Sequence, residues 1–345
     1  MGRANVTIYD VADAAGVSIS TVSNALNRPD RVREDTRRRV LQAAQSLGFT
    51  PKSEAVNQAR KGVGRIGVIA PFVAYSSYMR RLAGLLEVLN KANLEVCTYD
   101  EESAASRTSL LLSRLPLGSR LDGLVVMGIP LDDEAAERLQ AASLPTVLVD
   151  SEDPRFSCVV SDNALSGRLV ARHLLDAGHT RIGYLTEEHE VAARPQQGVQ
   201  RSQAFAAELA AAGHPLDPQR VVATAHTVDA ARVAAGRLLA DGSLTAVAAH
   251  DDTLAVGVLH AAAERGLGVP GGHAGAGCGA GDVAAAVGLT TIRQPFEESG
   301  RLAATTLLQL MATDHPVRRT TLRQELVVRS STVGNQLPIG TAVPG

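Results

Sequence analysis

The segment VTIYDVADAAGVSISTVSNALN, residues 6–27, constrains the fold of this chain most strongly. Apolar residues at helical spacing predict a first short helix, and Gly16 then permits a tight turn that a residue with a Cβ resists. Ser18 is suited to cap a second helix, because its side-chain oxygen can accept from the N–H groups that begin it. Val22 and Leu26, four residues apart, give that helix one buried face.

The exposed face of the second helix carries small polar residues and one isoleucine. A short helix with this face is typical of helix-turn-helix proteins, whose second helix enters the major groove of DNA. An ordinary helical hairpin in a small core has the same local pattern. From these residues alone, both interpretations stay open.

The charge distribution separates the two ends of the chain. Residues 1–61 hold 10 Lys/Arg against 6 Asp/Glu, whereas the remainder holds 24 against 30. A basic end on an acidic body is expected when only one end contacts a polyanion. The three cysteines have no metal-like spacing, no secretory signal opens the chain, and no apolar run reaches the roughly 18 residues that span a bilayer. We expect a cytoplasmic, nucleoid-associated protein with no membrane contact, metal or cofactor.

From residue 65 onward, short apolar runs alternate with helical segments, which indicates βαβ units and parallel sheets. The runs at 66–70, 94–99, 121–127 and 145–149 are expected strands, and the pattern restarts at 157–161. We therefore predict an α/β fold in which an all-α helix-turn-helix domain precedes two doubly wound parallel-sheet subdomains. This architecture resembles the periplasmic-binding-protein fold. Ligands of such sheets bind at the carboxyl ends of the strands.

The run TIYDVADAAGVSISTVSNALN at 7–27 closely resembles the DNA-binding headpiece of the LacI/GalR family of bacterial transcription regulators. The likeness continues through VREDTR at 32–37 and GFTP at 48–51, and it reappears in the body, for example in GHTRIG at 178–183 and LTTIRQP at 289–295. The resemblance implies a homodimeric repressor that binds a near-palindromic operator. It also implies that a small-molecule effector, a sugar or another polar metabolite, controls operator affinity from the cleft between the subdomains.

The resemblance also implies how the chain is divided. We expect a headpiece at 1–50, a hinge at 51–62 and a tail at 334–345 that is disordered. The expected N-terminal effector subdomain comprises 63–160 plus 294–321, and the C-terminal one comprises 161–293 plus 322–333.

Several polar residues of the headpiece are expected to contact DNA. Base edges would be read by Ile19, Ser20 and Asn24, of which Asn24 can pair bidentately with adenine and Ile19 offers only apolar contact. The residues expected at phosphates are Thr7, Ser18, Thr21, Ser23 and Asn27. In the family the hinge wedges a leucine into the minor groove, and that position holds Gln58 here. Because such wedges are normally apolar, we expect weaker DNA bending than a leucine-bearing relative gives.

The effector candidates follow strand ends in the body. They are Tyr78, Asp150, Arg201, His226, Asp251 and Gly279. Arg201 stands where the family has an effector-contacting arginine, just before an expected helix at 202–212. Asp251 stands where the family often has a ligand-binding asparagine, and the next residue, Asp252, is expected to cap the following helix. Ordinary roles stay open for several of these residues: core packing for Tyr78, and the surface for Arg201 and His226.

The run GAGCGAG at 275–281 departs from the family pattern, because the carboxylate that usually contacts the effector falls on Gly279. Three explanations stay open: the effector is not an ordinary sugar, Asp251 or Asp282 takes over, or the response has been lost. As a phosphate-cradling loop, the run matches neither the dinucleotide fingerprint nor the P-loop.

Two other functions are alternatives to transcription regulation. A solute-binding protein of a transport system shares the body fold, but the headpiece and the missing signal peptide argue against it. An enzyme is disfavoured because the sequence has no nucleophile elbow, zinc spacing or P-loop. We therefore expect no catalytic residues.

Overall fold

The computed structural model describes residues 7–27, 31–47, 64–101, 121–188, 196–240, 242–271, 273–279, 281–313 and 315–333. The expected hinge with Gln58 and the expected tail lie outside the described residues. The headpiece and the body form separate compact units and are described separately. None of the described helices is long and apolar enough to cross a membrane.

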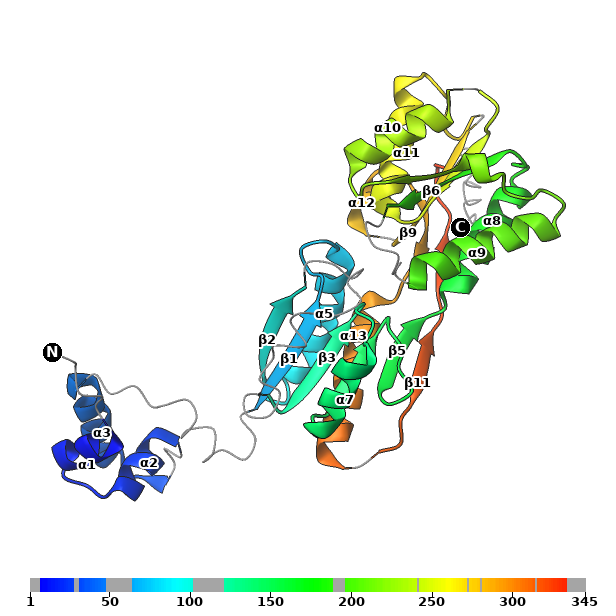
Figure 1. The fold of residues 1–345 in the computed structure, drawn as a ribbon. Helices are drawn as coiled ribbons and strands as arrows, with labels where there is room; N and C mark the ends of the chain where they lie inside the picture. The colour runs from blue at the N-terminus through cyan, green and yellow to red at the C-terminus, as the bar shows by residue number, and fades with distance from the viewer. Residues whose placement is uncertain are drawn as a thin grey trace, which may run out of the picture. The chain divides into compact units, whose positions relative to one another are not determined.

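The headpiece consists of three helices, α1 (Ile8–Ala15), α2 (Ile19–Asn27) and α3 (Glu34–Leu47), and the first two are those predicted around the Gly16 turn (Figure 1). Gly16 ends α1 with φ of 63°, the left-handed conformation that favours glycine. Ser18 caps α2, because its Oγ accepts from the N–H of Thr21 at 3.2 Å. Small side chains from all three helices form the core, namely Val11, Ala12, Ala15, Val22, Ala25, Val40, Ala43 and Ala44.

The first lobe of the body is built on a six-stranded sheet with the strand order β11-β5-β4-β3-β1-β2. The strands are β1 (Arg65–Ala70), β2 (Glu95–Asp100), β3 (Gly123–Met127), β4 (Thr146–Val149), β5 (Ser157–Ser161) and β11 (Arg319–Leu322). The described helices of this lobe are α5 (Ser76–Leu89), α7 (Asp133–Ala141) and α13 (Phe296–Ala312). The restart expected at 157–161 was wrong: β5 lies in the first sheet, between β4 and β11, and the second sheet begins along the chain with β6.

The second lobe repeats this plan with the strand order β12-β10-β9-β8-β6-β7. Its strands are β6 (Ile182–Glu187), β7 (Val221–Thr224), β8 (Ala246–Ala249), β9 (Ala274–Gly279), β10 (Thr290–Arg293) and β12 (Glu325–Val327). Its helices are α8 (Asn163–Asp176), α9 (Gln196–Ala211), α10 (Val228–Leu238), α11 (Asp252–Glu264) and α12 (Asp282–Ala286), with a short 3-10 turn, η2 (Pro218–Arg220). The predicted α/β fold with two parallel-sheet subdomains is confirmed, and the short strand β12 joins β10 antiparallel at the edge of the second sheet.

The glycine-rich run at 275–281 is largely a strand, because β9 lies between β8 and β10 in the second sheet. Its residues alternate in size with the period of two that strand geometry imposes. The glycines face α11: a Cβ on Gly275 would lie 3.1 Å from Leu259, and one on Gly277 would lie 3.0 Å from the Cβ of Ala255. The opposite face belongs to the core under α8 and α9, with Ala274, Ala276 and Cys278. The glycines therefore admit a closely packed helix rather than a phosphate.

A second close contact fixes α5 against α13 in the first lobe. A Cβ on Gly84 would lie 1.9 Å from the carbonyl oxygen of Glu297, and one on Gly300 would lie 1.9 Å from that of Arg81. Real Cβ atoms do not approach this closely, so glycine at both positions lets the two helix backbones touch. The contact matters for function because α5 carries cleft-lining side chains.

We predict that Gly84→Ala lowers the free energy of unfolding by about 1–3 kcal/mol, because the added methyl group forces α5 away from α13. Gly271→Ala is the matched control, since a Cβ there meets open space, and it should change stability by less than about 0.5 kcal/mol. Urea denaturation measures both. Equal stability of the two variants would contradict the inferred helix contact.

Candidate functional site

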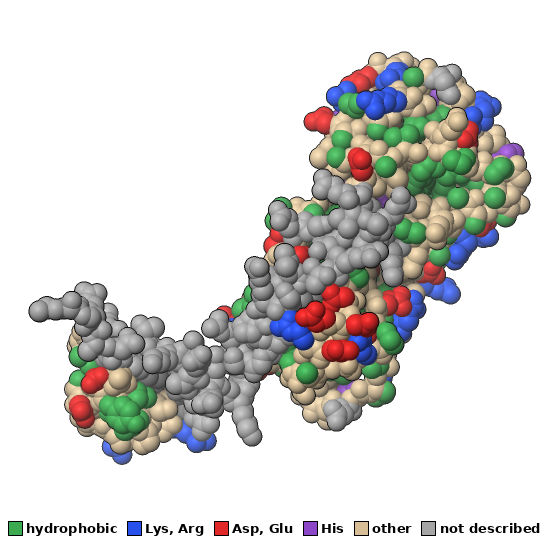
Figure 2. Space-filling model, viewed as in Figure 1, with side chains coloured by type: hydrophobic (Ala, Val, Ile, Leu, Met, Phe, Trp, Pro, Cys, Tyr) green, Lys and Arg blue, Asp and Glu red, His purple; other side chains and the backbone are tan. Residues whose placement is uncertain are grey.

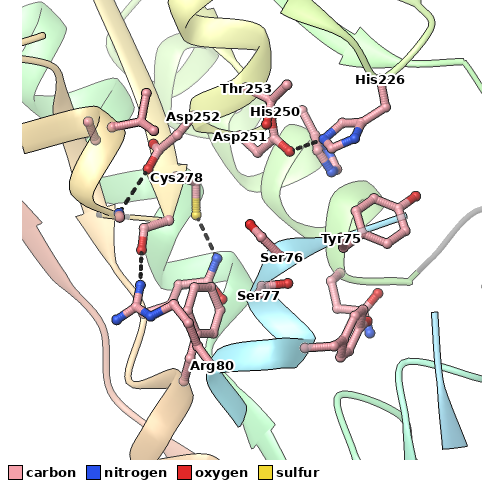
Figure 3. Close-up of a pocket in the computed structure, with 18 of the residues that line it drawn as sticks. Tyr75, Ser76, Ser77, Arg80, His226, His250, Asp251, Asp252, Thr253 and Cys278 are labelled. Carbon is pink, nitrogen blue, oxygen red and sulfur yellow. Dashed lines mark hydrogen bonds and ion pairs between the residues drawn. The ribbon is translucent and has the colours of Figure 1, made fainter. Parts of the chain in front are cut away.

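A cavity of about 500 Å³ lies between the two lobes, at the carboxyl ends of their parallel strands (Figure 3). This volume suits a small ligand. The six effector candidates predicted from the sequence all line the cavity: Tyr78, Asp150, Arg201, His226, Asp251 and Gly279. Segments that are far apart in the sequence thus meet at one place, as the doubly wound fold requires.

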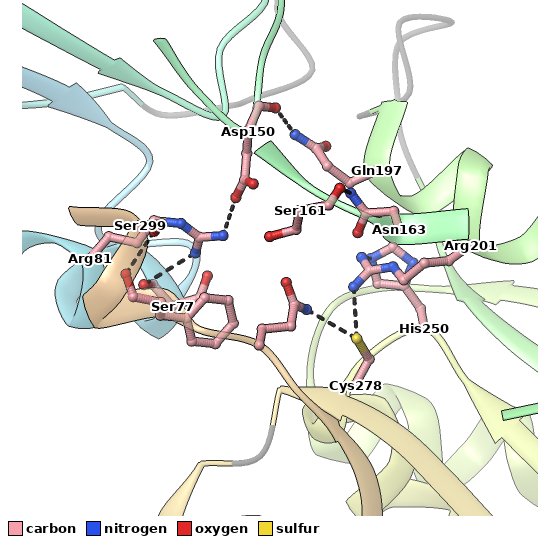
Figure 4. A network of polar contacts seen from close by, with 12 residues as sticks. Ser77, Arg81, Asp150, Ser161, Asn163, Gln197, Arg201, His250, Cys278 and Ser299 are labelled. Carbon is pink, nitrogen blue, oxygen red and sulfur yellow. Dashed lines mark hydrogen bonds and ion pairs between the residues drawn. The ribbon is translucent and has the colours of Figure 1, made fainter. Parts of the chain in front are cut away.

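The first lobe contributes the beginning of α5 to the cavity wall. Arg81 forms a buried ion pair with Asp150, the residue that follows β4 (Figure 4). Arg80 pairs with Glu297 of α13, with 2.7 Å between Nε and Oε1. Tyr78 is 8% exposed and belongs to the core of the first lobe, and it also borders the cavity. It therefore packs in the core and remains a candidate for effector contact. Burial raises the pKa of its hydroxyl, so the group is neutral near pH 7.

The expected division of roles between Asp251 and Asp252 was wrong. Asp251 is the N-cap of α11, and its Oδ1 accepts from the N–H of Leu254 at 3.0 Å. Its second oxygen binds Nε2 of His226, whose ring packs 5.0 Å from that of Tyr75. Asp251 therefore caps a helix and faces the cavity at once, because the helix begins at the edge of the sheet.

Asp252 supplies the carboxylate next to Gly279. Its oxygens accept from the hydroxyl of Thr291 and, at 3.4 Å, from the N–H of Gly281. A Cβ on Gly279 would lie 2.7 Å from one of these oxygens, and Gly279 has φ of 153°. A side chain at position 279 would thus collide with Asp252, which also lines the cavity. The carboxylate of Asp252 therefore lies where the side chain of an acidic residue at position 279 would leave the backbone.

Arg201 lies within α9 and not before a helix, because α9 begins six residues earlier than expected, at Gln196. Glycine at position 198 lets this first turn of α9 pass close to His250, because a Cβ there would lie 2.4 Å from the histidine ring. The guanidinium contacts Sγ of Cys278 at 3.1 Å and Nε2 of His250 at 3.2 Å (Figure 4). Burial raises the pKa of the Cys278 thiol, so that contact involves a neutral sulfur near pH 7.

Several cavity residues were missed by sequence reasoning because their roles depend on contacts between the lobes. The hydroxyl of Tyr75 donates to Glu187 at 2.7 Å, and the amide of Gln197 donates to the carbonyl of Asp150. Gln294 lines the cavity and follows β10. Gln294 falls within the segment LTTIRQP noticed in the sequence, but no spacing rule marks Glu187 or Gln197.

The headpiece residues expected at DNA gather on and around α2. Ile19 is 41% exposed, and the hydroxyl of Ser18 hydrogen-bonds to those of Ser20 and Thr21, each at 2.8 Å. Ser23 and Asn24 are half-exposed on the same helix. Hydrophobic side chains also reach the headpiece surface (Figure 2), where the large exposed ones are Tyr9, Ile19, Leu41 and Leu47.

Two further DNA candidates have different positions. Thr7 precedes α1, where its backbone N–H and its hydroxyl both donate to Asp10 at 2.7 Å. The side chain of Asn27, like Gln58, lies outside the described residues. Among the described residues, no group of three or more His, Cys, Asp or Glu side chains is placed to hold a metal ion.

Comparison with known proteins agrees with both parts of the chain. Residues 7–52 match the bacterial regulatory proteins of the lacI family, and residues 171–332 match the periplasmic binding protein-like domain. The repressor CytR of Escherichia coli is 30% identical over 336 residues, covering 94% of this chain and 96% of CytR. The regulator DegA of Bacillus subtilis is 29% identical, covering 85% and 88% of the two chains.

Solved structures show the same arrangement. The lac repressor dimer bound to operator and the anti-inducer ONPF is 25% identical, covers 96% of this chain and 100% of that chain, and has a TM-score of 0.73. A complex of the regulator CelR with cellobiose is 26% identical, with coverages of 94% and 99% and a TM-score of 0.67.

A helix-turn-helix headpiece joined to a two-lobed body with a cleft defines the class of DNA-binding transcription regulators that carry an effector-binding domain. Within this class, the chain belongs to the LacI family. The resemblance seen in the sequence is thereby confirmed, and a transport-system binding protein is not favoured.

We predict that the pKa of His226 lies above its ordinary value of about 6.5. Burial alone would lower it, but the hydrogen bond and the charge of Asp251 outweigh burial. The pair therefore stabilises the fold fully below the ordinary pKa, and this contribution is lost as pH rises through the raised one. Asp251→Asn, which keeps a good helix cap, should lower the pKa of His226.

Titration of the histidine ring signals by NMR measures this shift. His173 in α8 is the internal control, because burial lowers its pKa independently of Asp251. A pKa of His226 that is unchanged in Asp251→Asn would show that the pair does not control its protonation.

Proposed function

We propose that this protein is a cytoplasmic, homodimeric repressor that binds a near-palindromic operator and changes its operator affinity when a small polar effector enters the cleft. One observation carries the proposal: a single chain joins a helix-turn-helix headpiece to a cavity at the facing strand ends of two lobes. The lac repressor relative, a dimer bound to operator and anti-inducer, and the CelR–cellobiose complex support it. In this proposal the protein has no catalytic residues.

The proposed domain division keeps the boundaries expected from the sequence. Support comes from the sheets: β5 ends at Ser161 in the first lobe, β10 ends at Arg293 in the second, and β11 ends at Leu322 in the first. The chain therefore passes between the lobes three times, close to the proposed boundaries at 160/161, 293/294 and 321/322. Lobes joined at several points favour hinged closure around a ligand.

The proposed DNA contacts divide into positioning and reading groups. Thr7, Ser18, Thr21, Ser23 and Asn27 would contact phosphates, and Gln58 would lie in the minor groove. Ile19, Ser20 and Asn24 would face base edges. The hydrogen bonds of Ser18 to Ser20 and to Thr21 hold the three hydroxyls in place before DNA binds. Asn24 is then the reading residue with the most hydrogen-bonding capacity, since its amide can both donate and accept.

We predict that Asn24→Ala weakens operator binding by about 1–3 kcal/mol and relaxes discrimination at one base pair per half-site. Sequences selected from random DNA, followed by titration against single-base variants, measure both effects. Gln42→Ala, on the exposed side of α3, is the control and should leave binding unchanged. A uniform loss over all sequences would instead make Asn24 a backbone contact.

The proposed effector contacts are Tyr78, Asp150, Arg201, His226, Asp251 and Gly279. Closure of the cleft on an effector would change the relation between the lobes and so the operator affinity. Such coupling is reciprocal: an effector that changes operator affinity by a given factor must have its own affinity changed by operator by the same factor.

We expect this shared factor to be about 5- to 150-fold. Thermal-shift screening identifies the ligand, and anisotropy titrations in both directions then measure the coupling. Tyr75→Phe, which removes the hydroxyl that bridges the lobes to Glu187, should alter the coupling while the isolated headpiece contacts stay intact. A ligand that binds the cleft without changing operator affinity would refute effector control.

A further inference from the structure

The arginines that line the cavity differ in whether a carboxylate forms an ion pair with them. Arg80 and Arg81 each pair with a carboxylate of their own lobe, Glu297 and Asp150 respectively. For Arg201, no carboxylate of the described residues lies within ion-pairing distance, and its Nε is buried without a hydrogen-bond partner among them. A largely buried charge without a counter-ion is unfavourable unless a ligand supplies one.

Arg201 has two acceptors among the described side chains: Nε2 of His250, 3.2 Å from Nη2, and the weaker sulfur of Cys278. Its Nη1 donates to Sγ of Cys278 at 3.1 Å, and Nε2 of Gln294 donates to the same sulfur at 3.0 Å. A neutral thiol accepts hydrogen bonds poorly. Cys278 and Gln294 are only 6% and 7% exposed, so water has little access to these donors. Two N–H donors thus converge on a point where a ligand oxygen would be a much better acceptor.

The nearest acidic groups do not form an ion pair with Arg201. Asp251 lies within electrostatic reach of Arg201, but one of its oxygens caps α11 and the other binds His226. Asp252 lies on the other face of β9, where it accepts from Thr291 and Gly281. The carboxyl end of β9 therefore divides the cavity, with donors on the α9 side and carboxylates on the α11 side.

We propose that the effector is a small hydroxylated anion whose carboxylate or phosphate group binds Arg201 and Gln294 on the α9 side, while its hydroxyl groups donate to Asp251 and Asp252 on the α11 side. This inference rests on the proposed function, since it describes the ligand of the same cleft. The planar guanidinium favours these two anions because its parallel N–H groups match their oxygen spacing.

Three probes with one carbon skeleton test the ligand class: glucose, glucuronate and glucose 6-phosphate. Calorimetric titration of the full chain at constant ionic strength should give at least tenfold tighter binding for one of the two anions than for glucose. The two anionic arms separate a carboxylate from a phosphate ligand. Equal or tighter binding of glucose, or no binding of either anion at millimolar concentration, overturns the inference.

Two substitutions connect the preference to the proposed residues. Arg201→Gln should remove the preference for the anion. Gln294→Glu is nearly isosteric and supplies an internal carboxylate beside Arg201, so it should raise the melting temperature of the ligand-free protein and weaken anion binding at least tenfold. A lower melting temperature for Gln294→Glu together with unchanged anion binding would overturn the inference. Asp229→Asn in α10 is the matched control: it also changes one charge of the second lobe, but its side chain is 93% exposed and it is not among the residues that line the cavity, so it should retain the anion preference.

Operator binding separates this inference from the proposed function. If the wild-type protein binds an anionic probe but no specific DNA sequence, the proposed function fails and the ligand class stands. If glucose alone binds and changes operator affinity, the proposed function stands and the anion inference fails.

Discussion

The packing of α11 onto the glycine face of β9 determines what the cavity offers a ligand. Three glycines at alternate positions let the helix approach so closely that the carboxylate of Asp252 lies beside the end of the strand. The intervening residues point to the other side and bring Cys278 beneath Arg201. Strand alternation therefore separates an acidic side from a donor-rich side within one small cavity.

One residue at the start of α11 also has two structural roles. Asp251 caps the helix with one oxygen and binds His226 with the other, so a residue needed for local structure also orients a side chain in the cleft. His226 then packs against Tyr75 of the first lobe. The side chains of Asp251, His226 and Tyr75 thus link the start of α11 to the cavity wall and to the other lobe. Through these contacts a ligand at this point can bias the closure of the lobes.

Glycine has a different role in the first lobe and in the headpiece. In the first lobe, Gly84 and Gly300 let α5 and α13 touch, which holds Arg80 and Arg81 beside their carboxylate partners. In the headpiece, Gly16 provides the left-handed turn that sets α2 against α1 and α3. The aromatic-poor composition fits this construction, because small side chains fill spaces between closely packed backbones and leave no room for large rings.

The sequence alone determined the elements whose signals are local. Periodicity, the glycine turn and the Ser18 cap predicted the headpiece, and the alternation of apolar runs and helices predicted the two parallel sheets, because period and capping are properties of neighbouring residues. Strand ends and the resemblance to the family together also supplied the six cavity candidates. Only the tertiary structure decided that a glycine run is a strand, and that Asp251 rather than Asp252 is the cap. Those outcomes depend on which distant segments pack together: glycine has no strand preference of its own, and either of two adjacent aspartates can cap a helix until the sheet edge and Thr291 fix their positions.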